Sequence, residues 1–273
     1  VSESCKVILT GHGGDELFAG YPVFKLVDLL YQAGKSPVSA LAALARVRAS
    51  EWPPLAYFLG RRVWGGGDAL FLPVLMDGKA LFKGLLPEMY RGIKDINPAE
   101  GALKIIGDEK DPYRRLTLTY LLLYLPGLFV VEDKISMVHS LESRVPLCDN
   151  ELVELALSWP VSIKLHGGHL KAIPKAAMRG LLPDVLWQMP KRGFPTPLSK
   201  WLRGPLRTWM TERLLEPGSA LHGLFRPDYL RKVVQKYLEG WQGRCRPLDE
   251  IPTHRIWALL SLEAWLRMGK ERG

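Results

Sequence analysis

A glycine-rich loop near the start of the chain combines backbone donors with carboxylates. The run Thr-Gly-His-Gly-Gly-Asp-Glu follows a β-branched apolar stretch, Lys6–Thr10, which is typical of a strand. Gly11, Gly13 and Gly14 would let a phosphate approach backbone N–H groups at the start of a helix. The Asp15 carboxylate would repel that phosphate unless a divalent cation lay between them. Asp15 is therefore a magnesium candidate.

The same loop also has a purely structural interpretation. Asp15 and Glu16 would then only complement the positive end of the helix that follows a glycine turn. The spacing of these residues is compatible with both interpretations, so the loop alone does not predict nucleotide binding.

A second segment with chemical potential is the proline-flanked loop Pro190–Pro197, which presents two adjacent cations. Lys191 is a compact point charge, and the Arg192 guanidinium can hold two oxygens of a polyphosphate leaving group. A solvated basic loop is the alternative interpretation.

The third segment is Val131–Asp149, in which charged and apolar residues are closely mixed. This mixture does not match a simple amphipathic surface helix, so it indicates buried ion pairs or substrate contacts. Glu142 and Arg144 are the substrate candidates. Structural pairing of Glu142 with Arg144 or with Lys134 is the alternative.

Most of the chain that must position these segments has helical periodicity. From about Leu26 onward apolar residues recur at three- and four-residue steps, and Arg226–Leu238 with Ile256–Leu266 should form a closing helical pair. Lys6–Thr10 is the one convincing buried strand, and a strand buried on both faces needs partner strands. We expect those partners upstream of Val1. The predicted fold is α/β and mostly helical, with one strand near the N-terminus and a helical C-terminal lobe.

Composition limits the classes of function. The chain has 273 residues, 47% of them hydrophobic, and no apolar run long enough to span a membrane. Its three cysteines are widely spaced, which favours a reducing cytoplasm over a disulfide framework. The net charge of +9 could serve a nucleotide, a nucleic acid or an anionic membrane. Because no nucleic-acid motif accompanies the charge, we expect neither nucleic acid nor membrane as a partner.

Taken in order, the three segments resemble the synthetase domain of glutamine-hydrolysing asparagine synthetases and their relatives. The matching stretches are Thr10–Tyr21, Asp133–Asp149 and Lys191–Phe194, within a resemblance over roughly residues 1–210. It implies an adenine-nucleotide-hydrolase-like (PP-loop ATPase) fold, of which residues 1–273 would be the C-terminal portion. The family's pyrophosphate loop and N-terminal glutaminase domain are not found here. The chain by itself is therefore not expected to catalyse.

The resemblance also implies a reaction. MgATP would adenylate the side chain of aspartate, and ammonia from glutamine would attack to give asparagine, AMP and pyrophosphate. Thr10 and Gly11 match positions that contact the nucleotide, and Asp15 matches an aspartate associated with magnesium and pyrophosphate. Lys191 matches the lysine that stabilises phosphate charge as the adenylate forms. The resemblance leaves room for a homodimer.

His12 departs from the family pattern, which often has Glu or Asp at this position in asparagine synthetases and Tyr in β-lactam-forming relatives. An imidazole can still accept a proton from attacking ammonium or amine near neutral pH, provided that a partner group is close. His12 keeps two alternatives open: a ligase or cyclase that uses another amine, and a non-catalytic binding module of the same fold.

Overall fold

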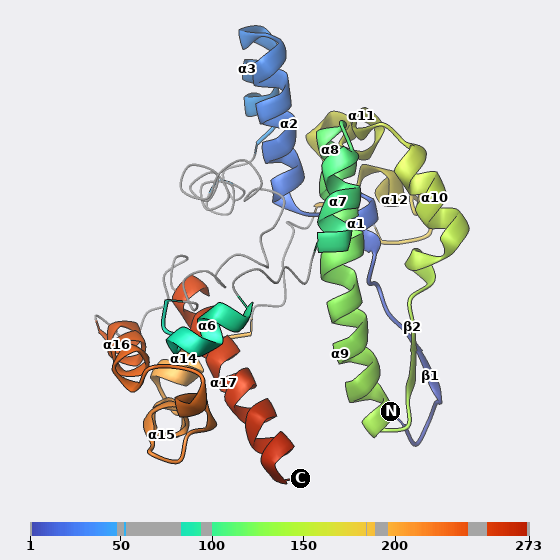
Figure 1. Ribbon diagram of the computed structural model, residues 1–273. Coiled ribbons are helices and arrows are strands. Elements are labelled where there is room, and N and C mark those ends of the chain that lie inside the picture. Colours follow the sequence, from blue (N-terminus) through green and yellow to red (C-terminus); the bar gives the residue numbers. More distant parts are fainter. Residues whose placement is uncertain are drawn as a thin grey trace. The chain divides into compact units, whose positions relative to one another are not determined.

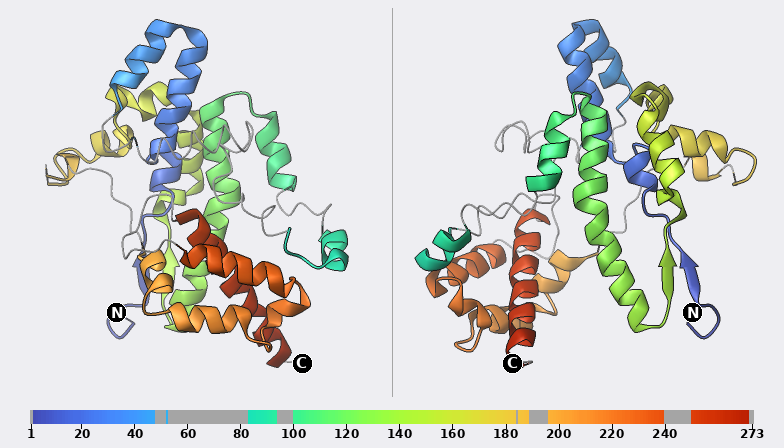
Figure 2. Two further views of the ribbon diagram at one scale, coloured as in Figure 1. Left: turned by 90° about the vertical axis from the view of Figure 1, so that its left-hand side faces the viewer. Right: turned by 45° about the vertical axis from the view of Figure 1, so that its right-hand side comes forward.

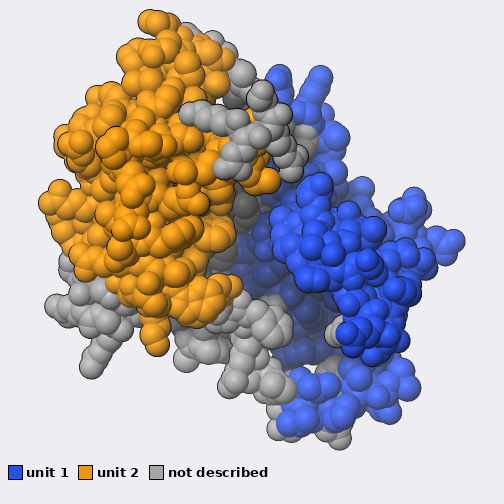
Figure 3. All heavy atoms as spheres, turned by 90° about the horizontal axis from the view of Figure 1, so that it is seen from below, with its two compact units in different colours: residues 1–74, 97–190 blue, residues 75–96, 191–273 orange. Residues whose placement is uncertain are grey.

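The computed structural model describes residues 2–47, 52, 83–93, 100–183, 185–188, 196–239 and 250–271. The chain divides into two compact units, coloured separately in Figure 3. Unit 1 comprises residues 1–74 and 97–190, and unit 2 comprises residues 75–96 and 191–273. Each unit has a hydrophobic core of its own and is described by itself.

Two short strands of unit 1 form a parallel pair, β1 (Val7–Leu9) with β2 (Glu142–Arg144). Ile8 lies opposite Ser143 in this register. The prediction of a strand at Lys6–Thr10 is confirmed, but two parts of it are wrong. Val7 and Leu9 are exposed, so the strand is not buried, and the chain itself supplies one partner strand.

The segment after β1 enters the helical part of unit 1. A loop leads into the short helix α1 (Gly14–Leu17), and α2 (Pro22–Lys35) and α3 (Pro37–Ala45) follow. Ser36 separates α2 from α3, and its hydroxyl caps α3 by accepting from the Ser39 N–H at 3.1 Å. The two helices form the blue hairpin in Figure 2.

A nearly continuous helical column forms the centre of unit 1. It consists of α8 (Pro112–Thr119), the π-helical turn η3 (Tyr120–Tyr124) and α9 (Leu125–Val138), and α7 (Glu100–Asp108) precedes it (Figure 1). Pro126 lies in the first turn of α9, where its ring cannot donate a hydrogen bond and crowds the carbonyl four residues earlier. The wider π-turn directly before it accommodates that conflict.

The rest of unit 1 consists of short elements. After β2 come η4 (Pro146–Cys148), α10 (Asn150–Ser158), α11 (Val161–Lys164), η5 (His166–Gly168), α12 (Ala172–Ala177) and α13 (Val185–Gln188). Asp149 caps α10 by accepting from the Glu151 and Leu152 N–H groups. The turns on either side of α11 bring Leu165 and Leu170 back into the main core.

The core of unit 1 joins α2 to the central column. Phe24 and Leu116 are almost completely buried, and Tyr120 stacks on Phe24 and Tyr21. A smaller cluster packs α1 against α10 through Leu17, Phe18 and Ala156. The helix that follows the glycine loop is therefore held on its apolar side by α10.

The regular elements of unit 2 are all helices in its described part, where Leu85 and Phe225 also form an isolated antiparallel bridge. It contains α6 (Pro87–Ile93), α14 (Leu198–Arg203), α15 (Arg207–Leu215), η6 (Ala220–Gly223), α16 (Pro227–Leu238) and α17 (Glu250–Glu271). The predicted closing helical pair is confirmed as α16 and α17. Their apolar faces share one core, in which Tyr237 of α16 lies 3.2 Å from the Thr253 hydroxyl of α17.

Two features of composition can be checked directly. Among the described helices none is both long and apolar enough to cross a membrane. Cys5 and Cys148 are free thiols.

The glycine loop is packed tightly at one of its positions and loosely at another. Gly13 has a φ of +88°, and a Cβ built on it would overlap the Cys148 sulfur of η4. Gly11 is exposed, and a Cβ there would meet no atom within 4 Å. Gly13 is therefore required both by backbone conformation and by the close approach of the η4 turn.

We predict that Gly13→Ala lowers the melting temperature by several degrees, because a left-handed residue with a side chain costs about 1–2 kcal/mol before the overlap with Cys148 is added. Gly11→Ala is the matched control and should melt close to the wild type. Thermal unfolding followed by circular dichroism compares them. Equal melting temperatures for the two variants would contradict this account of the loop.

Candidate functional site

The glycine loop lies at the carboxyl end of β1, against the turn that follows β2. The Thr10 N–H extends the strand pairing by donating to the Arg144 carbonyl at 2.9 Å. Cys148 of η4 donates from its thiol to the His12 carbonyl at 3.6 Å, and burial raises the pKa of this thiol. The loop is thus anchored at its first residue, Thr10, and again at its middle, His12. Cys148, which holds His12, lies 136 residues away from it in sequence.

His12 is held by a carboxylate from α9. Its Nδ1 lies 2.6 Å from Glu132 Oε2 and 3.0 Å from the Thr10 hydroxyl. The other carboxylate oxygen, Glu132 Oε1, accepts a hydrogen bond of 2.6 Å from the Ser143 hydroxyl of β2. The His12 ring also meets Phe129 edge-on, at 6.2 Å between ring centroids. The partner group that sequence analysis required for His12 is therefore in place.

This geometry sets which imidazole nitrogen is available. When Nδ1 bears the proton and donates to Glu132, the lone pair of the neutral ring lies on Nε2. The His12 side chain is about one-third exposed. A base of this kind can take a proton from an attacking amine, while Glu132 keeps the ring oriented through Nδ1.

Asp15, the first residue after the loop's last glycine, pairs with a lysine from a distant part of unit 1. Lys171 Nζ lies 3.1 Å from Asp15 Oδ1, and both side chains are partly buried. Lys171 has a φ of +55°, and its side chain lies over Gly20, where an added Cβ would crowd Lys171 Cε at 2.6 Å and overlap Asp15 Oδ1. The glycine at position 20 therefore leaves room for the Asp15–Lys171 pair.

The neighbouring acid, Glu16, is used inside the protein. It is almost fully buried, and its Oε1 accepts a hydrogen bond of 2.5 Å from the Tyr21 hydroxyl. Burial and the Glu16 carboxylate raise the pKa of Tyr21 far above its ordinary value, so the phenol stays protonated. Glu16 and Tyr21 stabilise the turn between α1 and α2, and Asp15 is the acid of this pair that faces the loop.

The loop still offers donors to an anion. Among the described residues, the backbone N–H groups of Gly11, His12 and Gly13 have no backbone carbonyl as acceptor. No group of three or more His, Cys, Asp or Glu side chains that could enclose a metal is found in the described part of the chain. Magnesium is commonly held by one or two carboxylates, with water and phosphate oxygens completing its shell. Asp15 is a single carboxylate next to the glycine loop in sequence, so it could supply at most one protein ligand to such an ion.

Glu142 and Arg144 are paired with each other on β2. Arg144 Nε donates to Glu142 Oε1 at 2.8 Å, and both side chains are more than half exposed. This contact lowers the pKa of Glu142 and raises that of Arg144. The structural pairing named as the alternative is thus present, and a substrate role for the two residues stays a prediction. Lys191 and Arg192 lie outside the described residues.

Sequence reasoning missed Glu132 and Lys171. Glu132 belongs to the mixed charged segment that had been singled out, but nothing local distinguishes it from its neighbour Asp133. Lys171 follows the Gly167-Gly168 turn, which offered no chemical signal. Both residues acquire a partner only when β1 pairs with β2 and when α11–α12 pack against the loop.

Comparison with known proteins agrees with the three motifs. The asparagine synthase family matches this chain over residues 1–267. A Mycobacterium tuberculosis protein, provisionally named as a glutamine-hydrolysing asparagine synthetase, is 27% identical over 95% of this chain and 39% of its own length. Bacillus subtilis asparagine synthetase (glutamine-hydrolysing) 1 is 24% identical over 94% of the chain and 41% of its own length.

A fungal relative has a different name. Amidase chyE of Penicillium rubens is 25% identical over 86% of this chain and 38% of its own length. The chain thus spans about two fifths of the length of the curated relatives that it matches. Because the family match extends over residues 1–267, nearly the whole chain, the chain belongs to the asparagine synthase family.

Proposed function

We propose that the protein is an ATP-dependent carbon–nitrogen ligase and that this chain supplies the amine-activating side of its synthetase site. The observation that supports this best is the His12 imidazole, fixed by Glu132 at 2.6 Å beside a glycine loop with unpaired N–H groups. A purely structural glycine turn would not need this pair. The family match agrees with this class of reaction.

His12 acts as the general base in this proposal. Its Nε2 accepts a proton from ammonium before the resulting ammonia attacks the activated carboxyl group, or from an amine nitrogen as that nitrogen attacks. Glu132 holds the ring through Nδ1, and the Ser143 hydroxyl holds Glu132, so the imidazole needs little reorganisation when it becomes charged.

The anion end of the site lies at the loop and Asp15. The N–H groups of Gly11 and Gly13, with the Thr10 hydroxyl, would contact phosphate oxygens, and Asp15 would hold magnesium. ATP, when bound, supplies the activation of the carboxyl group, with pyrophosphate as leaving group. Lys171 keeps Asp15 oriented and adds a positive charge at the same place.

The finer reaction is also a proposal. We take aspartate as the acid, ammonia from glutamine as the nucleophile, and asparagine, AMP and pyrophosphate as products, in a cytoplasmic enzyme with a glutaminase domain. The Bacillus subtilis relative is named for glutamine-hydrolysing asparagine synthesis, which supports this choice. Penicillium rubens chyE is named an amidase, and together with His12 this keeps another amine acceptor as the second candidate. The nucleotide fold is proposed to be of the PP-loop ATPase type.

Removing the base should stop amide formation more than activation. In the full-length protein supplied with aspartate, glutamine, ATP and magnesium, His12→Gln should lower asparagine formation roughly 10²–10⁴-fold. ATP–pyrophosphate exchange should persist, since it needs no base for the amine. Glu132→Gln should cause a smaller loss. Exposed Glu154→Gln on α10 is the matched control. Wild-type asparagine formation by His12→Gln would refute the role of His12.

Neutralising Asp15 and neutralising Lys171 should change two different quantities, the magnesium requirement and the KM for ATP. Asp15→Asn should raise the magnesium concentration for half-maximal pyrophosphate release by roughly tenfold or more. Lys171→Met should raise the KM for ATP by roughly tenfold, the worth of a charge-assisted hydrogen bond, and leave the KM for the amine unchanged. Exposed Lys104→Met is the control. Unchanged magnesium dependence in Asp15→Asn would remove Asp15 from the metal site.

Lys191 and Arg192 remain proposed ligands of the leaving pyrophosphate. Lys191→Ala in the full-length protein should abolish ATP–pyrophosphate exchange, because the point charge that stabilises the phosphates would be lost. Full retained exchange would remove Lys191 from the site.

A further inference from the structure

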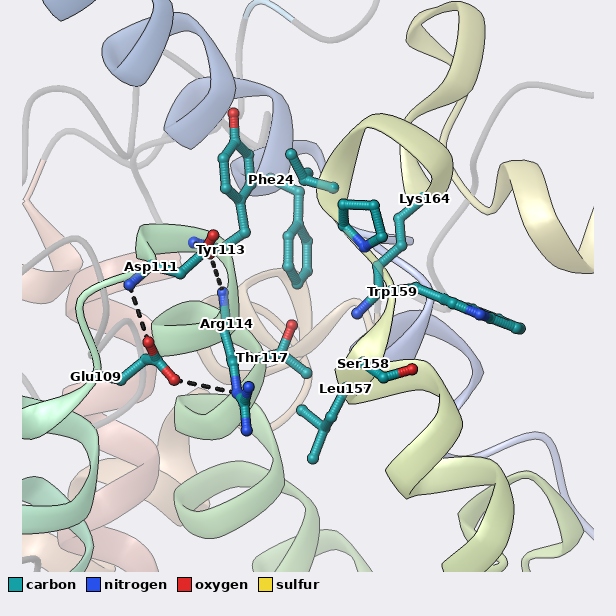
Figure 4. A pocket seen from close by; sticks show the side chains of 12 residues that line it. Phe24, Glu109, Asp111, Tyr113, Arg114, Thr117, Leu157, Ser158, Trp159 and Lys164 are labelled. Atoms are coloured by element: carbon teal, nitrogen blue, oxygen red, sulfur yellow. Dashed lines mark hydrogen bonds and ion pairs between the residues drawn. The ribbon is translucent and has the colours of Figure 1, made fainter.

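Unit 1 contains a pocket that shares no residue with the candidate site. It has a volume of about 280 Å³ and lies between the start of α8 and the α10–α11 turn (Figure 4). Its apolar walls come from Phe24, Leu157 and Val161. Its charged and titratable lining residues are Glu109, Asp111, Tyr113, Arg114 and Lys164.

Lys164 dominates the chemistry of this pocket. The residue is 6% exposed, and Figure 4 shows its side chain extending from α11 into the pocket. Among the described residues no hydrogen bond or ion pair reaches its Nζ. Lys164 Nζ is not among the fully buried polar atoms of the described residues that have no partner, so it reaches the open space of the pocket, where an ammonium favours a ligand that brings an acceptor.

The carboxylates of the pocket are already engaged. Glu109 accepts from the Asp111 N–H at 2.9 Å through Oε1 and pairs with Arg114 Nε at 3.0 Å through Oε2. Asp111 Oδ1 caps α8 by accepting from the Tyr113 and Arg114 N–H groups, each at 2.8 Å. The Tyr113 hydroxyl donates to Asp28. The N–H donors of Lys164 are therefore available to a ligand, whereas most carboxylate oxygens of the pocket already accept hydrogen bonds.

The charge state of Lys164 follows from the same surroundings. Burial lowers the pKa of Lys164 to about 8; Asp111 opposes this shift and Arg114 adds to it. Burial and its bond to Asp28 raise the pKa of Tyr113 well above the ordinary value, so Tyr113 remains neutral. At pH 7 most Lys164 side chains are ammonium ions, and above pH 8 most are neutral amines.

We propose that this pocket binds a small organic carboxylate, held by the Lys164 ammonium and enclosed by Phe24, Leu157 and Val161. The volume suits a compound of a few carbon atoms, and the apolar walls favour an organic acid over inorganic phosphate. The site is independent of the proposed ligase activity, because none of its residues takes part in that chemistry.

The first test is calorimetric titration of the protein with succinate at pH 7. The wild type should bind it, and Lys164→Met should weaken binding at least roughly tenfold, because a charge-assisted hydrogen bond is lost. Lys104→Met, which removes an exposed lysine of the same unit, should bind like the wild type. Circular dichroism checks the fold of each variant. Equal binding by Lys164→Met, or no binding at millimolar succinate, would overturn the proposal.

The second test needs no variant. Binding requires the ammonium form, whose pKa is about 8, so affinity should be full well below pH 8 and fall at least severalfold between pH 7 and pH 9.5. A flat pH profile would exclude Lys164 as the contact.

Inorganic phosphate is the second probe and should bind more weakly than succinate; tighter binding of phosphate would overturn the carboxylate assignment.

Discussion

The parallel pairing of β1 with β2 is the constraint on which the site depends. Each strand has only three residues, yet their register brings Thr10 to the Arg144 carbonyl and Ser143 to Glu132. A slip of one residue would turn Ser143 to the other face of the strand and release Glu132. The η4 turn would then no longer pack against Gly13. Backbone hydrogen bonds between segments more than 130 residues apart thus determine where His12 finds its carboxylate.

The acidic residues Asp15, Glu16 and Glu132 have different roles because their surroundings differ. Glu16 is buried and satisfied by Tyr21, so it serves the fold. Asp15 is partly exposed and balanced by Lys171, which suits exchange with an ion or a phosphate. Glu132 is fixed at both oxygens and faces an imidazole. The sequence alone does not distinguish the first two, which are adjacent, because the difference lies in what packs against them.

Elements with a strong local signal could be predicted, and those made by distant pairing could not. The apolar run Lys6–Thr10 and the helical pair α16–α17 follow from periodicity, which the chain displays locally. By contrast β2, Glu142–Arg144, is polar and becomes a strand only because β1 accepts it. The exposure of Val7 and Leu9 was mispredicted for the same reason, since burial of a strand depends on what covers the sheet. Of the candidate site, the glycine turn with its two following acids was predicted from spacing, whereas the partner residues Glu132 and Lys171 required the fold.

The roles of His12 and Glu132 depend on each other. An imidazole that gains a proton beside Glu132 becomes one half of an ion pair. A carboxylate at position 12 would instead put two like charges close together, which disfavours ionisation of both. A different residue at position 12 would therefore call for a different partner on α9. In the proposed ligase, His12 would take one proton from ammonium or from a protonated amine, which frees the nitrogen lone pair for attack.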